Sequence, residues 1–193
     1  DNVNNPNGSG NNFNNVLTGP QFEQVNATMR YPLARNGGGY QQLLEPIVML
    51  TAAPTVHRDK RQPIEDSADV QFDETNLFST NRFTGYDLVE GGSRATYGLR
   101  HAITGKGGAH MSLFGGQSYD FSRNELFPSS SGLHDRQSDY VGRMDFVPTD
   151  WLSVNYGFRF DHKDFSSKRQ DALVSVGASV FRPYVHYISG KIT

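Results

Sequence analysis

The residues most able to do chemistry lie in one long segment, between residues 54 and 93. Its acidic side chains are close-set, at Glu65, Asp66, Asp69, Asp73 and Glu74. Clustered carboxylate and carbonyl oxygens are the ligands that Ca²⁺ prefers, so a calcium site is one interpretation. The spacing matches no calcium-loop signature. We therefore favour a long ordered loop, tied down by apolar side chains and by acid–arginine pairs, and we predict no metal site.

Histidine and serine offer little for catalysis. The six histidines are His57, His101, His110, His134, His162 and His186, and they show no metal-ligand spacing. A serine hydrolase needs a serine beside a histidine. The pairs His110–Ser112 and His162–Ser153 could meet that need, but neither has a surrounding motif. There is no glycine-rich phosphate loop and no nucleophile elbow, so we predict no catalytic residue, no cofactor and no enzyme.

Two small basic clusters are candidates for binding. The first is His57, Arg58, Lys60 and Arg61, and the second is Lys163, Lys168 and Arg169. Lysine and arginine bind phosphate through paired charge and hydrogen bonds, so both clusters could contact phosphorylated glycolipid headgroups. Ordinary solvated surface charge is the alternative.

The composition excludes several classes of protein. The chain has 193 residues, of which 36% are hydrophobic and 12% aromatic, with 20 Gly and no Cys. No apolar run approaches the length of a membrane-spanning helix, and a disulfide scaffold needs cysteines. A net charge of −2 argues against nucleic acid as a partner. A soluble all-β domain or a transmembrane β-barrel remains. A barrel is compatible with this composition because apolar residues alternate with polar ones along each strand.

The two ends and the first 20 residues suggest a piece of a longer protein. The chain begins at Asp1 without a signal segment and ends at Thr193 without a recognisable terminus signal, so we expect a fragment or a processed product. Residues 1–20 are rich in Asn and Gly and predict a flexible loop or tail, with a prion-like tract as the sharper alternative. Residues 21–193 are expected to form one partial barrel domain, including the loop 54–93.

Period-two alternation predicts an all-β fold, an antiparallel up-and-down meander of about eight strands. The expected strands are Val25–Leu33, Leu43–Ala53, Ala95–Ile103, Ala109–Tyr119, Tyr140–Phe146, Leu152–Phe160, Ala172–Val180 and Tyr184–Ser189. Because proline cannot donate to a strand ladder, Pro46 predicts a local irregularity.

The connections alternate between short and long, which places tight turns at one end of the meander and long polar loops at the other. Outer-membrane barrels have this asymmetry, and their strands need about 9–11 residues to cross a bilayer. Aromatic residues near the strand ends suit interfacial girdles. Charged residues opposite the apolar positions would line a wet lumen. A soluble β-sandwich would instead place them in solvent.

Within the long loop, the sequence resembles the signature of LptD, a family of outer-membrane proteins that assemble lipopolysaccharide (LPS). The similar residues include Asp66, Phe72, Asp73, Asn76, Leu77, Phe78, Asn81, Arg82, Phe83, Gly85, Asp87 and Glu90. Weaker likeness extends to Arg30-Tyr31-Pro32, Leu44-Glu45-Pro46, Gly115-Gly116-Gln117-Ser118-Tyr119 and Ser131-Gly132-Leu133. The resemblance covers most of residues 21–189.

The resemblance implies an internal, C-terminal-half segment of a large barrel in the bacterial outer membrane. The family inserts LPS into the outer leaflet by transport without covalent chemistry. Its implied partners are LPS, outer-membrane lipid, an LptE-like lipoprotein plug and a periplasmic Lpt bridge that reaches a domain outside this chain. A generic porin or receptor barrel and a soluble glycan-binding β-sandwich are the alternatives. The Asn-rich head, the missing jellyroll and the absence of cysteine depart from the family pattern.

Overall fold

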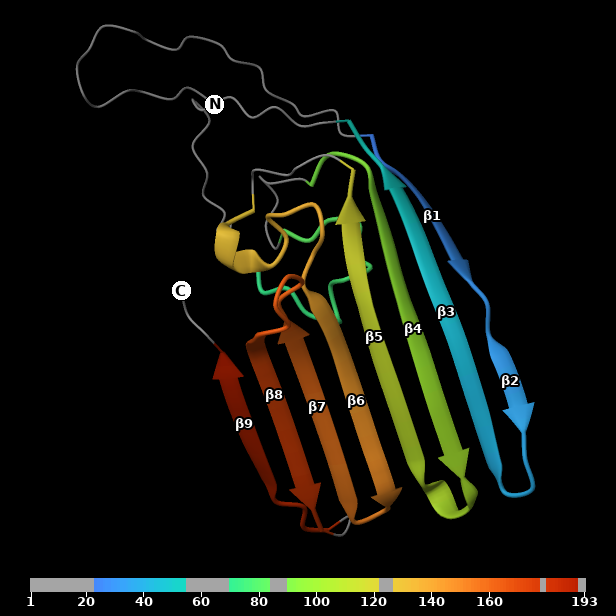
Figure 1. The fold of residues 1–193 in the computed structure, drawn as a ribbon. Coiled ribbons are helices and arrows are strands. Elements are labelled where there is room, and N and C mark those ends of the chain that lie inside the picture. Colours follow the sequence, from blue (N-terminus) through green and yellow to red (C-terminus); the bar gives the residue numbers. More distant parts are fainter. Residues whose placement is uncertain (1–22, 55–69, 84–89, 122–126, 178–179, 191–193) are drawn as a thin grey trace, which may run out of the picture.

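A computed structural model describes residues 23–54, 70–83, 90–121, 127–177 and 180–190. These residues form one antiparallel sheet and two short 3-10 turns, without an α-helix among them (Figure 1). The strands are β1 (Val25–Arg30), β2 (Leu33–Asn36), β3 (Tyr40–Ala52), β4 (Arg94–Gly105), β5 (His110–Asp120), β6 (Tyr140–Thr149), β7 (Leu152–Phe160), β8 (Ser167–Val176) and β9 (Tyr184–Gly190). The turns are η1 (Lys106–Gly108) and η2 (Ser129–Ser131). In the described parts of the chain, no helix is long and apolar enough to cross a membrane.

The sheet is the predicted meander. Its order is β1-β3-β4-β5-β6-β7-β8-β9, with β2 also paired to β3. The connection lengths confirm the predicted asymmetry: β2–β3, β4–β5 and β6–β7 join through tight turns at one end, called here the turn end. The connections β3–β4 and β5–β6 are long and lie at the opposite loop end (Figure 1).

The expected meander of about eight strands is confirmed, and the structure has nine because the first predicted strand is divided into β1 and β2. The ladder with β3 is interrupted between Arg30 and Leu33. There the amide of Tyr31 donates to the carbonyl of Pro46 at 3.2 Å, but Pro46 has no N–H to return the bond. The irregularity predicted at Pro46 therefore falls on the neighbouring strands, while β3 itself runs unbroken.

The two faces of the sheet differ sharply in chemistry. On the face called here the apolar face, large hydrophobic side chains stay exposed, including Met29, Leu50, Leu99, Leu113 and Tyr187. The opposite polar face carries the charged strand residues Glu45, Arg94, Arg100, Asp120, Arg143, Asp145, Arg159, Arg169 and Asp171, which the strand register places on one side. This distribution is the reverse of that in a water-soluble sheet, which buries its apolar face.

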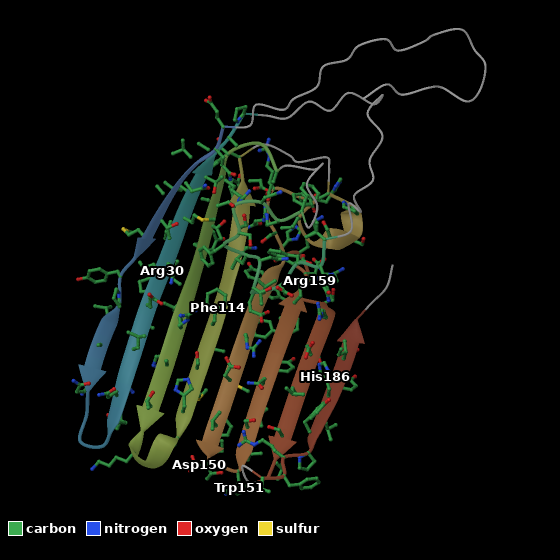
Figure 2. All side chains as sticks on the ribbon, turned by 180° about the vertical axis from the view of Figure 1, so that it is seen from behind. Arg30, Phe114, Asp150, Trp151, Arg159 and His186 are labelled. Atoms are coloured by element: carbon green, nitrogen blue, oxygen red, sulfur yellow. The ribbon has the colours of Figure 1, made fainter. Side chains whose placement is uncertain are left out.

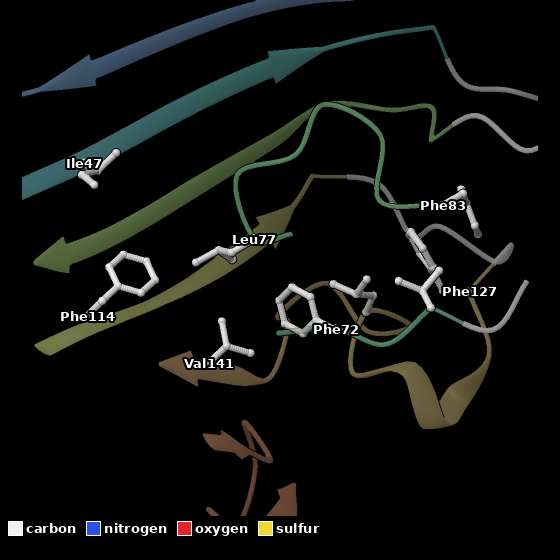
Figure 3. Close-up of a cluster of buried hydrophobic side chains, with 9 residues drawn as sticks. Ile47, Phe72, Leu77, Phe83, Phe114, Phe127 and Val141 are labelled. Atoms are coloured by element: carbon white, nitrogen blue, oxygen red, sulfur yellow. The ribbon is translucent and has the colours of Figure 1, made fainter. Parts of the chain in front are cut away.

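The buried core lies on the polar face, near the loop end (Figure 3). Strand residues supply Ile47, Phe114 and Val141 to it. The two long connections supply the remaining members, which are Val70, Phe72, Leu77, Phe83, Phe127 and Leu133. The core therefore forms between loops and sheet, and its residues come from connections far apart in the sequence.

The outermost strands have no neighbour on their outer sides among the described residues. Every residue of β1, β2 and β9 is exposed, and β1 and β9 do not pair with each other. The sheet is therefore open. Residues 1–20, expected to be a flexible tail, lie outside the described residues.

Candidate functional site

The candidate site is the β3–β4 connection where it folds over the polar face. Phe72 and Leu77 are completely buried there. Gly98 on β4 and Gly116 on β5 face each other across the ladder and leave room for the loop. A Cβ atom added at Gly116 would lie 2.5 Å from Leu77 Cδ2 and 2.8 Å from the Tyr97 carbonyl oxygen. The glycine thus permits the close approach of the loop to the sheet.

Aromatic contacts join this loop to the β5–β6 connection. The rings of Phe83 and Phe127 stack with centroids 4.4 Å apart. The guanidinium of Arg82 lies 5.5 Å from the centroid of Phe127 and 6.0 Å from that of Phe72. Phe78 packs at the edge of the same cluster, 6.2 Å from Phe114. Both long connections therefore pack as one unit on the sheet.

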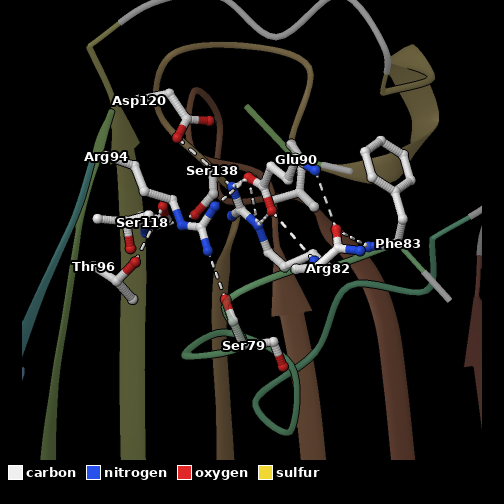
Figure 4. A network of polar contacts seen from close by, with 12 residues as sticks. Ser79, Arg82, Phe83, Glu90, Arg94, Thr96, Ser118, Asp120 and Ser138 are labelled. Atoms are coloured by element: carbon white, nitrogen blue, oxygen red, sulfur yellow. Dashed lines mark hydrogen bonds and ion pairs between the residues drawn. The ribbon is translucent and has the colours of Figure 1, made fainter. Parts of the chain in front are cut away.

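A buried ionic network pins the loop to the strands (Figure 4). Arg82 Nε donates to the two carboxylate oxygens of Glu90 at 3.0 and 2.9 Å. From the first residue of β4, Arg94 Nη1 lies 2.8 Å from Glu90 Oε1. All three side chains are at most 2% exposed. Glu90, which we name the clamp carboxylate, is thus held between two guanidiniums.

Further contacts complete the network. Arg94 Nη2 donates to the backbone carbonyls of Ser79 and Thr80 at 2.6 and 2.9 Å. Asp120, the last residue of β5, brings its carboxylate to 3.6 Å from Arg82 Nη2. Burial alone would lower the pKa of Arg82, but the facing carboxylates of Glu90 and Asp120 together outweigh burial, and the pKa is raised. Arg82 therefore stays charged within the buried cluster.

The tip of the loop is held more loosely. Asp73 Oδ1 accepts hydrogen bonds from the Thr75 amide at 2.9 Å and from its hydroxyl at 2.5 Å, which closes a turn. Glu74 then lies 3.4 Å from Arg143 on β6, and Asp73 lies 4.0 Å from Arg169 on β8. These pairs are partly exposed, so each contributes little stability.

A polar groove of about 290 Å³ lies between the tip and strands β6–β9. Its walls carry residues of both charges, including Glu74, Arg143, Arg159, Asp171 and His186. Arg159 and His186 are also marked on the strands in Figure 2. Phe72, Phe158 and Leu173 also line the groove, so its lining suits a ligand that carries both polar and apolar groups.

Most of the predicted signature residues meet at this site. The described ones are Phe72, Asp73, Asn76, Leu77, Phe78, Asn81, Arg82, Phe83 and Glu90. Asn81 Oδ1 accepts from the amides of Phe83 and Glu90, at 3.3 and 3.2 Å. Asp66, Gly85 and Asp87 lie outside the described residues, as do the acidic residues Glu65 and Asp69. Asp73 and Glu74, the described members of the supposed calcium group, pair with arginines instead.

Sequence reasoning missed the partners that come from β5 and its connection. Asp120, Phe127 and Leu133 are all buried. The register of the β4–β5 hairpin sets Arg94 opposite Asp120, so extending that register from the tight turn would have found the pair. Phe127 lies in a loop that is mostly polar in sequence, so its apolar side chain was the available signal. Leu133 belongs to the weaker family likeness, which did not place it in the core.

The predicted headgroup cluster Lys163, Lys168 and Arg169 lies at or near the loop end, and its members contact carboxylates. Lys163 Nζ lies 2.6 Å from Asp135, and Lys168 Nζ lies 3.0 Å from Asp161. The Lys163 amide donates to Asp161, and this bond, with Lys168, lowers the pKa of Asp161 to about 2. Arg58, Lys60 and Arg61 lie outside the described residues.

The histidines form no catalytic pair with the serines considered. His110 contacts Thr104 Oγ1 at 3.1 Å, and Ser153 contacts Ser175 Oγ at 2.6 Å. Among the described residues, Asp139, Asp161 and His162 do approach closely enough to share a cation. The two carboxylates, however, already face Arg159 and Lys168.

The fold and the site define an all-β meander sheet with an exposed apolar face and an ordered loop folded over its polar face. Comparison with known families gives this class a name. The family described as LptD, LPS transport system D, matches residues 4–182, and the chain belongs to this family.

Individual relatives agree with the family match. The chain is similar to the LPS-assembly proteins LptD of Nitrosospira multiformis (24% identity over 131 residues), Nitrosomonas eutropha (30% over 113) and Pseudomonas putida (29% over 150). The matches cover 67%, 56% and 75% of this chain, but only 14%, 15% and 16% of those proteins. The chain thus spans a small part of its relatives' length.

We predict that Glu90→Gln destabilises the folded protein by about 3 kcal/mol or more, because Asp120 alone then faces two buried guanidiniums and one positive charge is left uncompensated. The measurement is the midpoint of denaturant unfolding of the full-length protein in detergent. Glu45→Gln is the matched control: its pair with Arg100 is 3.7 Å long and the arginine side chain is 45% exposed, so a loss below about 1 kcal/mol is expected. Equal losses would contradict the role of the clamp carboxylate.

A second prediction concerns Gly116. Gly116→Val should push Leu77 away and release the loop, which exposes Arg82 to trypsin in limited proteolysis. Gly115→Val, one residue away, is the control, because a Cβ at Gly115 meets nothing within 4 Å. If both variants resist trypsin equally, the close packing of loop and sheet at Gly116 is refuted.

Proposed function

We propose that this chain is a segment of an outer-membrane β-barrel that inserts LPS into the outer leaflet by transport, without covalent chemistry. The observation that carries the proposal is the exposed apolar face, opposite a polar face that holds buried loops. In a bilayer-spanning barrel the outward side contacts lipid and the inward side contacts water. The meander, with turns at one end and long loops at the other, supports the same assignment.

The apolar face also argues against a soluble sandwich. In a sandwich two sheets bury their apolar faces against each other. Here the described residues form a single sheet, and Tyr97, Leu99 and Leu113 on its apolar face are 41–49% exposed. Membership of the LptD family favours LPS transport over the porin alternative.

Within this role, we propose that the β3–β4 connection, called here the signature loop, shapes the inner path for LPS. The ionic contacts of Glu90 and the buried apolar cluster hold this loop against β4 and β5. The tip of the loop borders the groove on β6–β9. LPS carries a polar, phosphorylated saccharide that such a groove could admit. Asp66, Gly85 and Asp87 belong to the same proposal through the family signature alone.

The partners are also proposed at family level. An LptE-like lipoprotein would plug the closed barrel, and a periplasmic Lpt bridge would deliver LPS through a domain outside this chain. Arg58, Lys60, Arg61, Lys163, Lys168 and Arg169 remain candidates for headgroup contacts. Lys163 and Lys168 would have to exchange a carboxylate partner for a phosphate, an exchange that their exposure permits.

The test replaces Leu77, Phe78 and Phe83 with Ser in the full-length protein. Each substitution removes packing from the cluster, and large-to-small changes of this kind cost about 2–5 kcal/mol at a fully buried site. We expect less folded protein by heat-modifiable mobility, less LPS at the cell surface, and greater entry of bulky antibiotics.

Val180→Ser, at a position 95% exposed, is the control and should change none of these readouts. Normal amounts of folded protein together with an intact envelope in the triple variant would contradict the proposed role of the loop.

A further inference from the structure

A second pocket lies on the apolar face near the turn end, where β2, β3 and β4 run side by side. Its volume is about 230 Å³, and its lining is Leu33, Ala34, Arg35, Gln42, Leu44 and His101. The register sets Arg35 beside Gln42, and Leu44 between Leu33 and His101. Three polar side chains therefore meet on a face that is otherwise mainly apolar.

The charge of this pocket is not balanced within the described residues. Arg35 and His101 form no ion pair there, and the lining contains no acidic side chain. On the polar face, by contrast, Arg94, Arg143 and Arg159 each lie within 4 Å of a carboxylate. A guanidinium beside Leu33 and Leu44 is therefore complementary to an external anion that also carries apolar groups.

The depth of the pocket fits the boundary between lipid and water. Exposed aromatic residues mark the turn end: Tyr40 and Trp151 are 43% and 54% exposed. Trp151 lies at the tight β6–β7 turn (Figure 2). Tyrosine and tryptophan concentrate at the headgroup level of bilayers, and Arg35 lies only a few residues from Tyr40.

We propose that this pocket binds the phosphate of an anionic glycerophospholipid in the leaflet at the turn end. Arg35 donates to the phosphate oxygens, Gln42 and His101 donate through their side-chain N–H groups, and Leu33 and Leu44 contact the start of the acyl chains. This proposal rests on the proposed function in one respect, because it requires the apolar face to lie in a membrane.

The experiment is native mass spectrometry of the full-length protein in detergent, with equal amounts of phosphatidylglycerol and phosphatidylcholine. We expect the wild type to retain phosphatidylglycerol preferentially. Arg35→Gln should weaken this retention about tenfold, the effect of losing one charge-assisted hydrogen-bonding group. Arg30→Gln is the matched control and should behave as wild type. Arg30 is also exposed and unpaired within the described residues, but it lies on the polar face.

The outcomes separate the two proposals. Unchanged retention in Arg35→Gln, or no preference in the wild type, overturns the phospholipid site while leaving a detergent-dependent barrel intact. Tighter binding of bis-phosphorylated lipid A than of phosphatidylglycerol, lost in Arg35→Gln, overturns the assigned source of the phosphate. A full-length protein that stays soluble without detergent overturns both proposals.

Discussion

The packing of the long connections on this sheet depends on one buried carboxylate, that of Glu90. Two guanidiniums from different elements meet it: Arg82 from the loop and Arg94 from β4. Each of these ions would cost several kcal/mol to bury alone, so their burial depends on mutual pairing. Asp120 adds a second negative charge nearby, which balances the two positive charges formally. Since Arg82 also lies against Phe72 and Phe127, the ionic and apolar contacts hold both long connections to the sheet together.

The distribution of side chains over the two faces of the sheet explains why the loops must pack against it. A soluble β-sheet stabilises itself by hiding apolar side chains, whereas this one buries charged residues and leaves Leu99, Leu113 and Tyr97 exposed. The polar face therefore needs its own packing, and the loops supply it through Phe72, Leu77 and Phe127. In the proposed outer-membrane barrel, lipid covers the other face. Membership of the LptD family and the mixed-charge groove beside the loop tip are consistent with a polar path along the inner side.

Local periodicity predicted most of the strands and the placement of the tight turns at one end, because alternation and connection length can be recognised within short stretches of sequence. The sequence predicted an irregularity at Pro46, but not that it would fall on the neighbouring strand and separate β1 from β2. The signature residues were found by resemblance. Their geometry was not, because the contacts of Leu77 with Gly116 and of Phe83 with Phe127 join segments far apart in the chain. Such contacts depend on the packing of two loops at once and leave no local pattern.

The most direct test of the account compares Ser112 and Leu113, neighbours on β5 that point to opposite faces. Each is replaced by cysteine and labelled with a small fluorophore in the full-length protein, reconstituted in vesicles that contain brominated phospholipid. Strong quenching at residue 113 and weak quenching at residue 112 is the predicted result, since only the apolar face contacts lipid. Equal quenching at both positions, or stronger quenching at residue 112, would contradict the account.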